Sequence, residues 1–301
     1  MAGPSLTVFG NLILDDVVLP DGRTRMGQPG GAALYAALGA RLWGVGVGIV
    51  SVVGEDYPAD VLGRLDEQGI DLAGVRRTGG PTLRTWLLYE GRRRRVVHRL
   101  DGPTHAEVSP GPGDLPAGWR PGACHLAPMP FAAQAELLAT LCREPQMLVS
   151  LDPYELVREE SLGEWHGLLG GLDLLFLSED EMELPGGLAE PRAALRRLAG
   201  PPGRLSWVLY KQGARGGLAF DVTAGRFERW RPSAAEIADP TGAGDAFAGG
   251  LLAGRLLGDP PSAALARGQV SASFALEAEG PQALLRAAPA SAAQRLAALA
   301  P

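Results

Sequence analysis

Residues 239–250 read DPTGAGDAFAGG, a glycine-rich turn that runs directly into an apolar-faced helix. Apolar residues spaced four apart within 247–256 indicate that this helix begins near Gly244. Small side chains in the turn let the backbone approach a ligand closely, and the helix dipole favours negative charge at this end. The stretch therefore predicts a phosphate-binding turn, and the residues that form it are Gly242, Ala243 and Gly244.

Asp245 lies in the first turn of this predicted helix. A carboxylate there complements the helix dipole, so one interpretation of Asp245 is a structural capping residue. Beside an anion site, however, a carboxylate is electrostatically costly unless it takes a proton from an attacking hydroxyl, and a phosphoryl acceptor supplies that proton. We therefore expect Asp245 to act as a general base, while the backbone amides stabilise charge on the transferring phosphoryl group.

Short β-rich runs alternate with amphipathic runs along most of the chain. Because the runs expected to be strands are largely apolar, as strands covered on both faces are, the pattern predicts an α/β fold with a mostly parallel sheet between helical layers. The predicted strands are 7–18, 45–53, 123–127, 146–151, 172–177 and 206–210, and the predicted helices are 32–43, 58–68, 132–142, 191–198, 244–257, 261–276 and 291–299.

Residues 82–90 and 95–101 break this alternation, because two strand-like runs follow each other with no helix between them. That is the signature of a β-hairpin. We expect a small β lid built from about 11–25 and 80–104, attached to a single domain covering 1–301. The apolar side chains of the hairpin need cover, which either the substrate or a second subunit could supply, so we also expect a homodimer formed through the lid.

The bulk composition excludes several classes of protein. The chain has 301 residues, 46% of them hydrophobic, and a formal net charge of −6, so no attraction to nucleic acid or to an anionic membrane is expected. Two cysteines, Cys124 and Cys142, suit a reducing compartment, and with no secretory signal apparent we expect a cytoplasmic protein.

The most apolar window, 32–53, contains Arg41 and four glycines and favours helix, turn and strand over a membrane span. The absence of GxxxxGKS/T and GxGxxG strings argues against an ordinary P-loop enzyme or a dinucleotide-binding dehydrogenase.

At 239–250 the chain resembles the ribokinase-like, or PfkB, family of carbohydrate kinases, whose C-terminal signature has the form D-T/P-x-G-A-G-D. Residues 10–15 are similar to the family's first strand, and the Gly30-Gly31 pair before a small-residue helix is similar to its acceptor-binding half. The resemblance implies a ribokinase-like three-layer αβα domain with a small β lid. It also implies an ATP-dependent kinase that phosphorylates a hydroxyl of a small sugar, sugar acid or polyol.

The acceptor side of this expected site includes Asp15, which the resemblance implies hydrogen-bonds acceptor hydroxyls. By its residues alone, the Gly30-Gly31 pair could be an ordinary turn, or it could provide free amides and room for a polyol to approach the backbone. Tyr35 stands where many family members have Asn, and an aromatic residue there could stack on a ring or narrow the pocket. The expected substrate-binding residues are therefore Asp15, Gly30, Gly31 and Tyr35.

Glu181 follows the predicted strand 172–177, at a position where the family has an N-x-x-E motif acting near magnesium and phosphate. Ser178 replaces the motif's Asn in this chain, and its hydroxyl could still hold a metal-bound water. The acidic run 179–183 could equally be a solvated helix start. Because Mg²⁺ keeps several waters and takes one or two carboxylates plus phosphate oxygens, Glu181 is the expected metal residue.

Other residues are expected to contact the nucleotide. Lys211 stands where many family members have Thr and could pair with ATP phosphates, although a surface lysine at a strand end is an equal alternative. By the resemblance, the nucleotide base lies between the 213–216 turn and the helix at 261–276. The expected nucleotide-binding residues are Ser178, Lys211, Gly213, Gly216, Thr241 and Gln269.

Two other functions compete with the sugar kinase. One is a nucleoside kinase of the same superfamily, which the sequence barely separates from a sugar kinase. The other is a catalytically silent ligand-binding protein on the same fold, suggested by the altered Ser178 and Tyr35. Retention of Asp245 and of the intact turn 242–244 argues against the silent protein.

Overall fold

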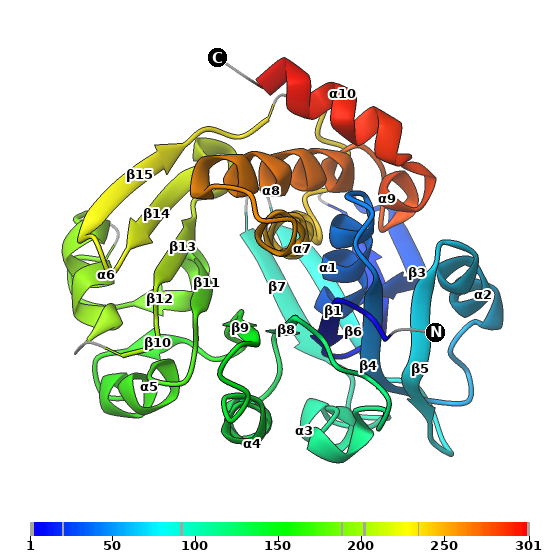
Figure 1. Ribbon diagram of the computed structural model, residues 1–301. Helices are drawn as coiled ribbons and strands as arrows, with labels where there is room; N and C mark the ends of the chain where they lie inside the picture. Colours follow the sequence, from blue (N-terminus) through cyan, green and yellow to red (C-terminus); the bar gives the residue numbers. More distant parts are fainter. Residues whose placement is uncertain are drawn as a thin grey trace.

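The computed structural model describes residues 3–19, 21–90, 93–187, 189–200, 203–233 and 235–299. Within them, a nine-stranded sheet runs in the order β15-β14-β13-β11-β9-β8-β1-β4-β5 (Figure 1). Its strands are β1 (Leu6–Phe9), β4 (Val47–Val53), β5 (Ile70–Arg77), β8 (Ala123–Leu126), β9 (Leu148–Leu151), β11 (Leu174–Ser178), β13 (Trp207–Lys211), β14 (Gly217–Asp221) and β15 (Arg226–Trp230).

The strands from β13 to β5 in this order are all parallel, whereas β14 and β15 pair antiparallel at one margin of the sheet. The predicted α/β class with a mostly parallel sheet is therefore confirmed. The sequence patterns did not predict β5, β14 or β15. Two of these three strands, β5 and β15, lie at the two margins of the sheet, and most of their residues are exposed or half-buried. They therefore lack the apolar runs typical of central strands.

Helices cover both faces of the sheet (Figure 1). Alternate residues of β11 show the division, because Leu174 and Phe176 pack on one side while Leu175 and Leu177 pack on the other. The first face carries α1 (Ala32–Arg41), α2 (Ala59–Glu67), α7 (Ala243–Leu256), α8 (Pro261–Leu276), α9 (Gln282–Arg286) and α10 (Pro289–Leu299), and the second carries α4 (Phe131–Leu141), α5 (Leu162–Leu169) and α6 (Pro191–Ala199). Of these, α5 and α9 were not predicted.

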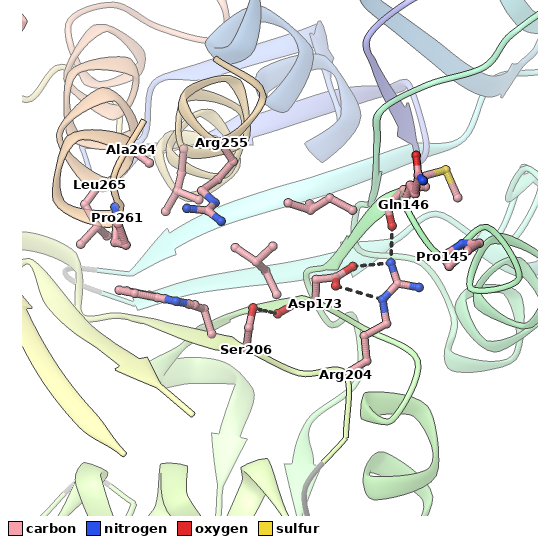
Figure 2. A pocket seen from close by; sticks show the side chains of 14 residues that line it. Pro145, Gln146, Asp173, Arg204, Ser206, Arg255, Pro261, Ala264 and Leu265 are labelled. Atoms are coloured by element: carbon pink, nitrogen blue, oxygen red, sulfur yellow. Dashed lines mark hydrogen bonds and ion pairs between the residues drawn. The ribbon is translucent and has the colours of Figure 1, made fainter. Parts of the chain in front are cut away.

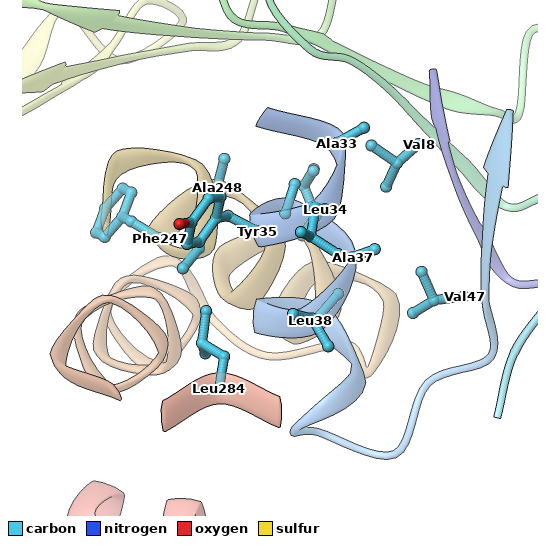
Figure 3. Packing of buried hydrophobic residues seen from close by; sticks show 14 of the residues in the cluster. Val8, Ala33, Leu34, Tyr35, Ala37, Leu38, Val47, Phe247, Ala248 and Leu284 are labelled. Carbon is cyan, nitrogen blue, oxygen red and sulfur yellow. The ribbon is translucent and has the colours of Figure 1, made fainter. Parts of the chain in front are cut away.

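Small residues bring α1 and α7 into direct backbone contact. A Cβ atom at Gly249 would lie 1.9 Å from the carbonyl oxygen of Ala36, and one at Gly39 would lie 2.4 Å from that of Ala246. Figure 3 shows the same interface, with side chains of α1 directed at α7 and at the strands below it. This close packing fixes the start of α7 relative to α1.

A second sheet, the lid sheet, has the strand order β3-β2-β6-β7. It contains the predicted hairpin, β6 paired antiparallel with β7, while the hairpin turn at Gly91 and Arg92 lies outside the described residues. The lid sheet extends beyond the predicted 11–25 to residue 30. Its strands are β2 (Ile13–Val18), β3 (Thr24–Gly30), β6 (Arg84–Glu90) and β7 (Arg93–His98).

The predicted single strand 7–18 is wrong, because β1 ends at Phe9 and β2 belongs to the lid sheet. The intervening backbone is held by side chains of other segments. The amide of Leu12 donates to Ser51 Oγ at 2.9 Å, and Asn11 Nδ2 donates to the carbonyl of Val108 at 2.9 Å. These contacts pull the chain out of the central sheet, and periodicity alone does not reveal them.

Six short elements complete the described residues. They are α3 (His105–Val108), the 3₁₀ turns Pro112–Asp114, Glu179–Glu181 and Gly213–Arg215, and the parallel pair β10 (Val157–Arg158) and β12 (Met182–Glu183). None of the described helices is both long and apolar enough to cross a bilayer.

Candidate active site

The glycine-rich turn ends at Gly242, which caps α7 with φ +75° and ψ +1°, so the helix begins one residue earlier than expected, at Ala243. Asp239 holds the turn in shape: its Oδ1 accepts the Thr241 amide at 2.9 Å and its Oδ2 accepts the Gly280 amide at 3.1 Å. The Ala243 amide contacts the carbonyl of Pro240 at a long 3.4 Å. The first-turn amides of a helix have no intrahelical acceptors, so the start of α7 presents donors and a positive dipole end to the site.

Tyr35 of α1 packs directly on Gly242. A Cβ atom there would lie 2.2 Å from the Tyr35 ring, and the positive φ already disfavours any L side chain. Figure 3 shows Tyr35 projecting from α1 toward α7 beside Phe247 and Ala248. Burial raises the pKa of the Tyr35 hydroxyl well above its ordinary value, and the carboxylates of Asp15, Asp239 and Asp245 add to the effect.

Asp15 belongs to the lid sheet and Asp245 to α7, and the carboxylates of both contribute to the raised pKa of the Tyr35 hydroxyl. The predicted acceptor residue and the predicted base therefore both lie within electrostatic range of Tyr35.

Lys211 ends β13 and lies beside the start of α7. Its Nζ is 2.5 Å from Asp152 Oδ2 and 3.3 Å from the position that a Cβ on Gly244 would occupy. Burial alone would lower the pKa of the Lys211 ammonium. The carboxylate of Asp152, followed by those of Glu181 and Asp245, outweighs burial and raises this pKa above its ordinary value. Lys211 is thus a largely buried, paired cation, with 13% of its side chain exposed, rather than a surface lysine.

Asp152 is a site residue that the sequence reasoning missed. It follows β9 directly, is 1% exposed, and its Oδ1 has no hydrogen-bond partner among the described residues. A buried carboxylate oxygen without a donor is costly in a closed interior, so its position points to a ligand or water. The available signal was its place at the carboxyl end of a buried strand, where α/β folds build their sites.

Ser178 and Glu181 form a local capping arrangement. The Ser178 amide donates to Glu181 Oε2 at 2.6 Å, and Ser178 is the register partner of Lys211 across β11 and β13. The Ser178 amide thus holds the Glu181 carboxylate at the end of β11, and this carboxylate contributes to the raised pKa of Lys211. The described residues contain no group of three or more side chains arranged as metal ligands. Sparse carboxylates, here Asp152 and Glu181, still fit Mg²⁺, which takes one or two carboxylates and completes its shell with water and phosphate.

On the acceptor side, Asp15 is 5% exposed and its Oδ1 accepts the Thr85 hydroxyl at 2.6 Å. Its Oδ2 lies 1.9 Å from where a Cβ on Gly30 would stand, so the missing side chain of Gly30 makes room for Asp15. At Gly31, with φ +101°, a Cβ would lie 2.1 Å from the carbonyl oxygen of Asn11. The space at the glycine pair is therefore filled by the protein's own Asp15 and Asn11.

A narrow cavity of about 20 Å³ lies between the lid sheet and the glycine-rich turn. Such a volume holds roughly one water molecule, so the lid sheet lies closed against the glycine-rich turn. Contacts that join the lid sheet to the body in the described residues include a hydrogen bond shared by the hydroxyls of Tyr89 and Thr241, and an ion pair between Arg25 and Glu279. Polar or charged lining residues are Asp15, Arg25, Gln28, Tyr35, Asp239, Thr241 and Glu279.

The nucleotide candidates meet on one backbone segment. Gly216, at φ +81°, closes the 3₁₀ turn Gly213–Arg215, and a Cβ on it would lie 2.1 Å from the carbonyl oxygen of Trp230. The side-chain amide of Gln269 on α8 donates to the carbonyl of Arg231. Gly216 of the turn and Gln269 of α8 therefore both contact the backbone at residues 230–231.

Comparison with known proteins agrees with this geometry. Residues 128–288 match the model of the pfkB family carbohydrate kinases. A cytidine kinase of Thermococcus kodakarensis is 32% identical over 262 residues, covering 85% of this chain and 90% of that protein, and an Escherichia coli fructokinase is 29% identical, covering 82% and 83%. A solved ribokinase of Cryptococcus neoformans in complex with ADP superposes with a TM-score of 0.78 at 18% identity, covering 97% of this chain and all of that one.

The family match spans more than half of the chain, and the cytidine kinase is more than 30% identical over most of both chains. On these grounds the chain belongs to the pfkB family of carbohydrate kinases.

Proposed function

We propose that this protein transfers the γ-phosphoryl group of ATP to a hydroxyl of a small sugar, sugar acid or polyol. The observation that carries the proposal is the position of the largely buried Lys211 ammonium, which lies against Gly244 at the start of α7. This ammonium is paired with the Asp152 carboxylate, and the carboxylates of Asp152 and Asp245 raise its pKa. A cation and a helix N-terminus at one point favour a polyphosphate, and a carboxylate in the same turn supplies a base.

In the proposed reaction, Asp15 positions the acceptor under the lid sheet and Asp245 accepts the proton of the attacking hydroxyl. The acceptor oxygen then bonds to the γ-phosphorus as the bond to the ADP oxygen breaks, and ADP leaves with that electron pair. Lys211 and the amides at 242–244 stabilise the negative charge on the transferring group, where positioning and electrostatics do most of the work. The closed lid sheet excludes water, which protects the phosphoryl group from hydrolysis.

Mg²⁺ is the ion we assign to this reaction, and Asp152 and Glu181 are the residues that would hold it, through water or directly. The unpartnered Asp152 Oδ1 supports this assignment. When bound, the ion neutralises charge on the phosphate oxygens. Ser178, Thr241, Gly213, Gly216 and Gln269 are assigned to the nucleotide side, with the base held next to residues 230–231.

A nucleoside is the second candidate acceptor, and a specific observation favours it. The cytidine kinase of Thermococcus kodakarensis is 32% identical over 85% of this chain. A sugar kinase and a nucleoside kinase would use the same phosphate-binding turn and the same base, Asp245. They would differ in the part of the acceptor that occupies the space beyond Asp15 and Tyr35.

An acceptor panel tests the proposal. Release of ADP from ATP and Mg²⁺ is measured with pentoses, hexoses, sugar acids, polyols and each common nucleoside at equal concentration. Turnover with sugars, sugar acids or polyols supports the leading assignment, and turnover restricted to nucleosides replaces it with the second. ATP and acceptor binding without ADP release by any acceptor would instead identify a ligand-binding protein.

We also infer a homodimer formed through the lid sheet. Apolar side chains remain exposed on it: Met26 is 51% exposed, Val96 45% and Val97 40%. Light scattering at several concentrations should give twice the monomer mass. Val97→Asp should yield a monomer, whereas Leu257→Asp, a change to an exposed apolar residue after α7, should leave the mass unchanged; a monomer throughout contradicts the inference.

A further inference from the structure

A second cavity, the amino-end cavity, lies at the amino ends of the parallel strands, whereas the candidate active site lies at their carboxyl ends. It opens where β9, β11 and β13 begin, below α7 and α8 (Figure 2). Its volume is about 160 Å³, several times that of the cavity under the lid sheet. None of the residues assigned to phosphoryl transfer lines it.

The charges around the amino-end cavity leave one cation uncompensated. Arg204 is neutralised by Asp173, with Nε to Oδ1 at 2.9 Å and a second contact at 2.7 Å. The side chain of Arg255, in the last turn of α7, is exposed and forms no ion pair or hydrogen bond with any residue that the structure describes. Figure 2 shows Arg255 on the helical side of the cavity, with Asp173 and Arg204 on the sheet side. Among the charged lining residues, the sum is therefore one positive charge.

On the sheet side of the amino-end cavity, the side chains of Ser206 and Arg204 already have hydrogen-bond partners within the protein. Ser206 Oγ donates to the carbonyl of Asp173 at 2.9 Å, and Arg204 also donates to the carbonyls of Cys142 and Met147. The Arg255 guanidinium thus has donors left for a ligand. Its guanidinium can donate two parallel hydrogen bonds to a carboxylate.

The rest of the wall is apolar and includes a flat aromatic surface. Trp207, at the start of β13, is half-buried, and the partly buried ring lies beside aliphatic side chains from the sheet and from α7 and α8. A cavity of roughly 150 Å³ is known to hold a benzene ring. The apolar lining residues are Met147, Leu148, Leu174, Trp207, Leu251, Pro261, Ala264 and Leu265.

We propose that the amino-end cavity binds a small carboxylate that carries one six-membered ring, with the carboxylate on Arg255 and the ring among Trp207, Leu148 and Leu251. The single uncompensated charge matches a monoanion, and the volume matches one ring. This site is independent of the proposed kinase activity, because it shares no residue with the phosphate turn, the lid sheet or the nucleotide candidates.

The probe for the test is 4-fluorobenzoate, followed by ¹⁹F NMR with the full-length protein in the absence of ATP and acceptor. We expect saturable line broadening that unlabelled benzoate reverses. Benzyl alcohol, which lacks the charge, and acetate, which lacks the ring, should displace the probe at least about tenfold less well, since each loses one half of the recognition.

Arg255→Ala should weaken probe binding by roughly tenfold or more, because a charged hydrogen-bonded contact is lost. Arg255→Lys should retain part of the affinity, and Trp207→Leu should weaken binding with circular dichroism unchanged. The matched control is Arg286→Ala, which removes another exposed arginine of the same helical layer. Absence of saturable binding, or equal affinity in Arg255→Ala, overturns the proposal, and displacement by benzyl alcohol or acetate as effective as by benzoate overturns the assigned ligand class.

Discussion

The hydroxyl of Tyr89 in the lid sheet and the hydroxyl of Thr241 in the glycine-rich turn share a hydrogen bond. This contact joins the lid sheet to the segment that precedes the amides at the start of α7, to which we assign phosphate binding. The two residues lie 152 positions apart along the chain.

Tyr89→Phe should therefore destabilise the closed lid. A neutral hydrogen bond contributes about 1 kcal/mol, so we expect the KM for the acceptor to rise about three- to tenfold. The affinity for ADP, measured by calorimetry, should change less than twofold. Thr241→Ser keeps the hydroxyl and serves as the control; an acceptor KM equal to that of the unaltered protein in Tyr89→Phe would show that the contact does not hold the lid.

Asp245→Asn should lower turnover roughly a hundredfold or more, because the amide cannot accept the acceptor's proton. ATP affinity should remain nearly unchanged, since the phosphate contacts are backbone amides and Lys211. The measurement is steady-state ADP release together with ATP binding by calorimetry. Asp66→Asn, at an exposed position of α2, is the matched control, and normal turnover in Asp245→Asn refutes the base assignment.

Gly30→Ala should damage the acceptor site without affecting the nucleotide site. The added Cβ would overlap Asp15 Oδ2 at 1.9 Å, so the carboxylate has to move away from its position beside Thr85. We expect the acceptor KM to rise about tenfold or more, as loss of a charged hydrogen bond implies, while ADP affinity stays the same. Gly63→Ala, where the added atom meets open space in α2, should change neither quantity.

The free energy of unfolding should fall as the solution is acidified below about pH 6.5, in part because of His125. Burial, with a smaller contribution from Lys211, lowers the pKa of His125 from 6.5 to about 3. The folded state therefore binds fewer protons than the unfolded state between these values. The corresponding stability is complete above pH 6.5 and is lost progressively down to about pH 3.

Urea denaturation at pH 7.0 and pH 4.5 measures this effect. A lowered pKa of this size implies a loss of about 3 kcal/mol between the two pH values from this group. In His125→Gln the loss on acidification should be smaller by a similar amount, since the amide does not titrate, even though the variant is less stable at pH 7.0. If the free energy of unfolding falls equally on acidification in the unaltered protein and in His125→Gln, protonation of His125 does not destabilise the folded state, and the prediction is wrong.

Several features follow from local sequence alone. The run 239–250 predicted both the start of α7 and the donor-rich turn, because a left-handed Gly242 and a four-residue apolar spacing are local properties. The β6–β7 hairpin and most central strands were predicted for the same reason, because apolar runs indicate buried strands and turn residues indicate where a strand ends.

Tertiary structure decided how these pieces form a site. The pairing of Lys211 with Asp152, 59 residues apart, turned an ambiguous strand-end lysine into a buried cation, and no local pattern records which strand ends become neighbours. The departure of the chain from the central sheet at Gly10, the closed lid and the amino-end cavity likewise depend on contacts between distant segments. Sequence periodicity determines which face of an element is buried, whereas the side chains that meet at a sheet edge depend on strand order, which long-range packing sets.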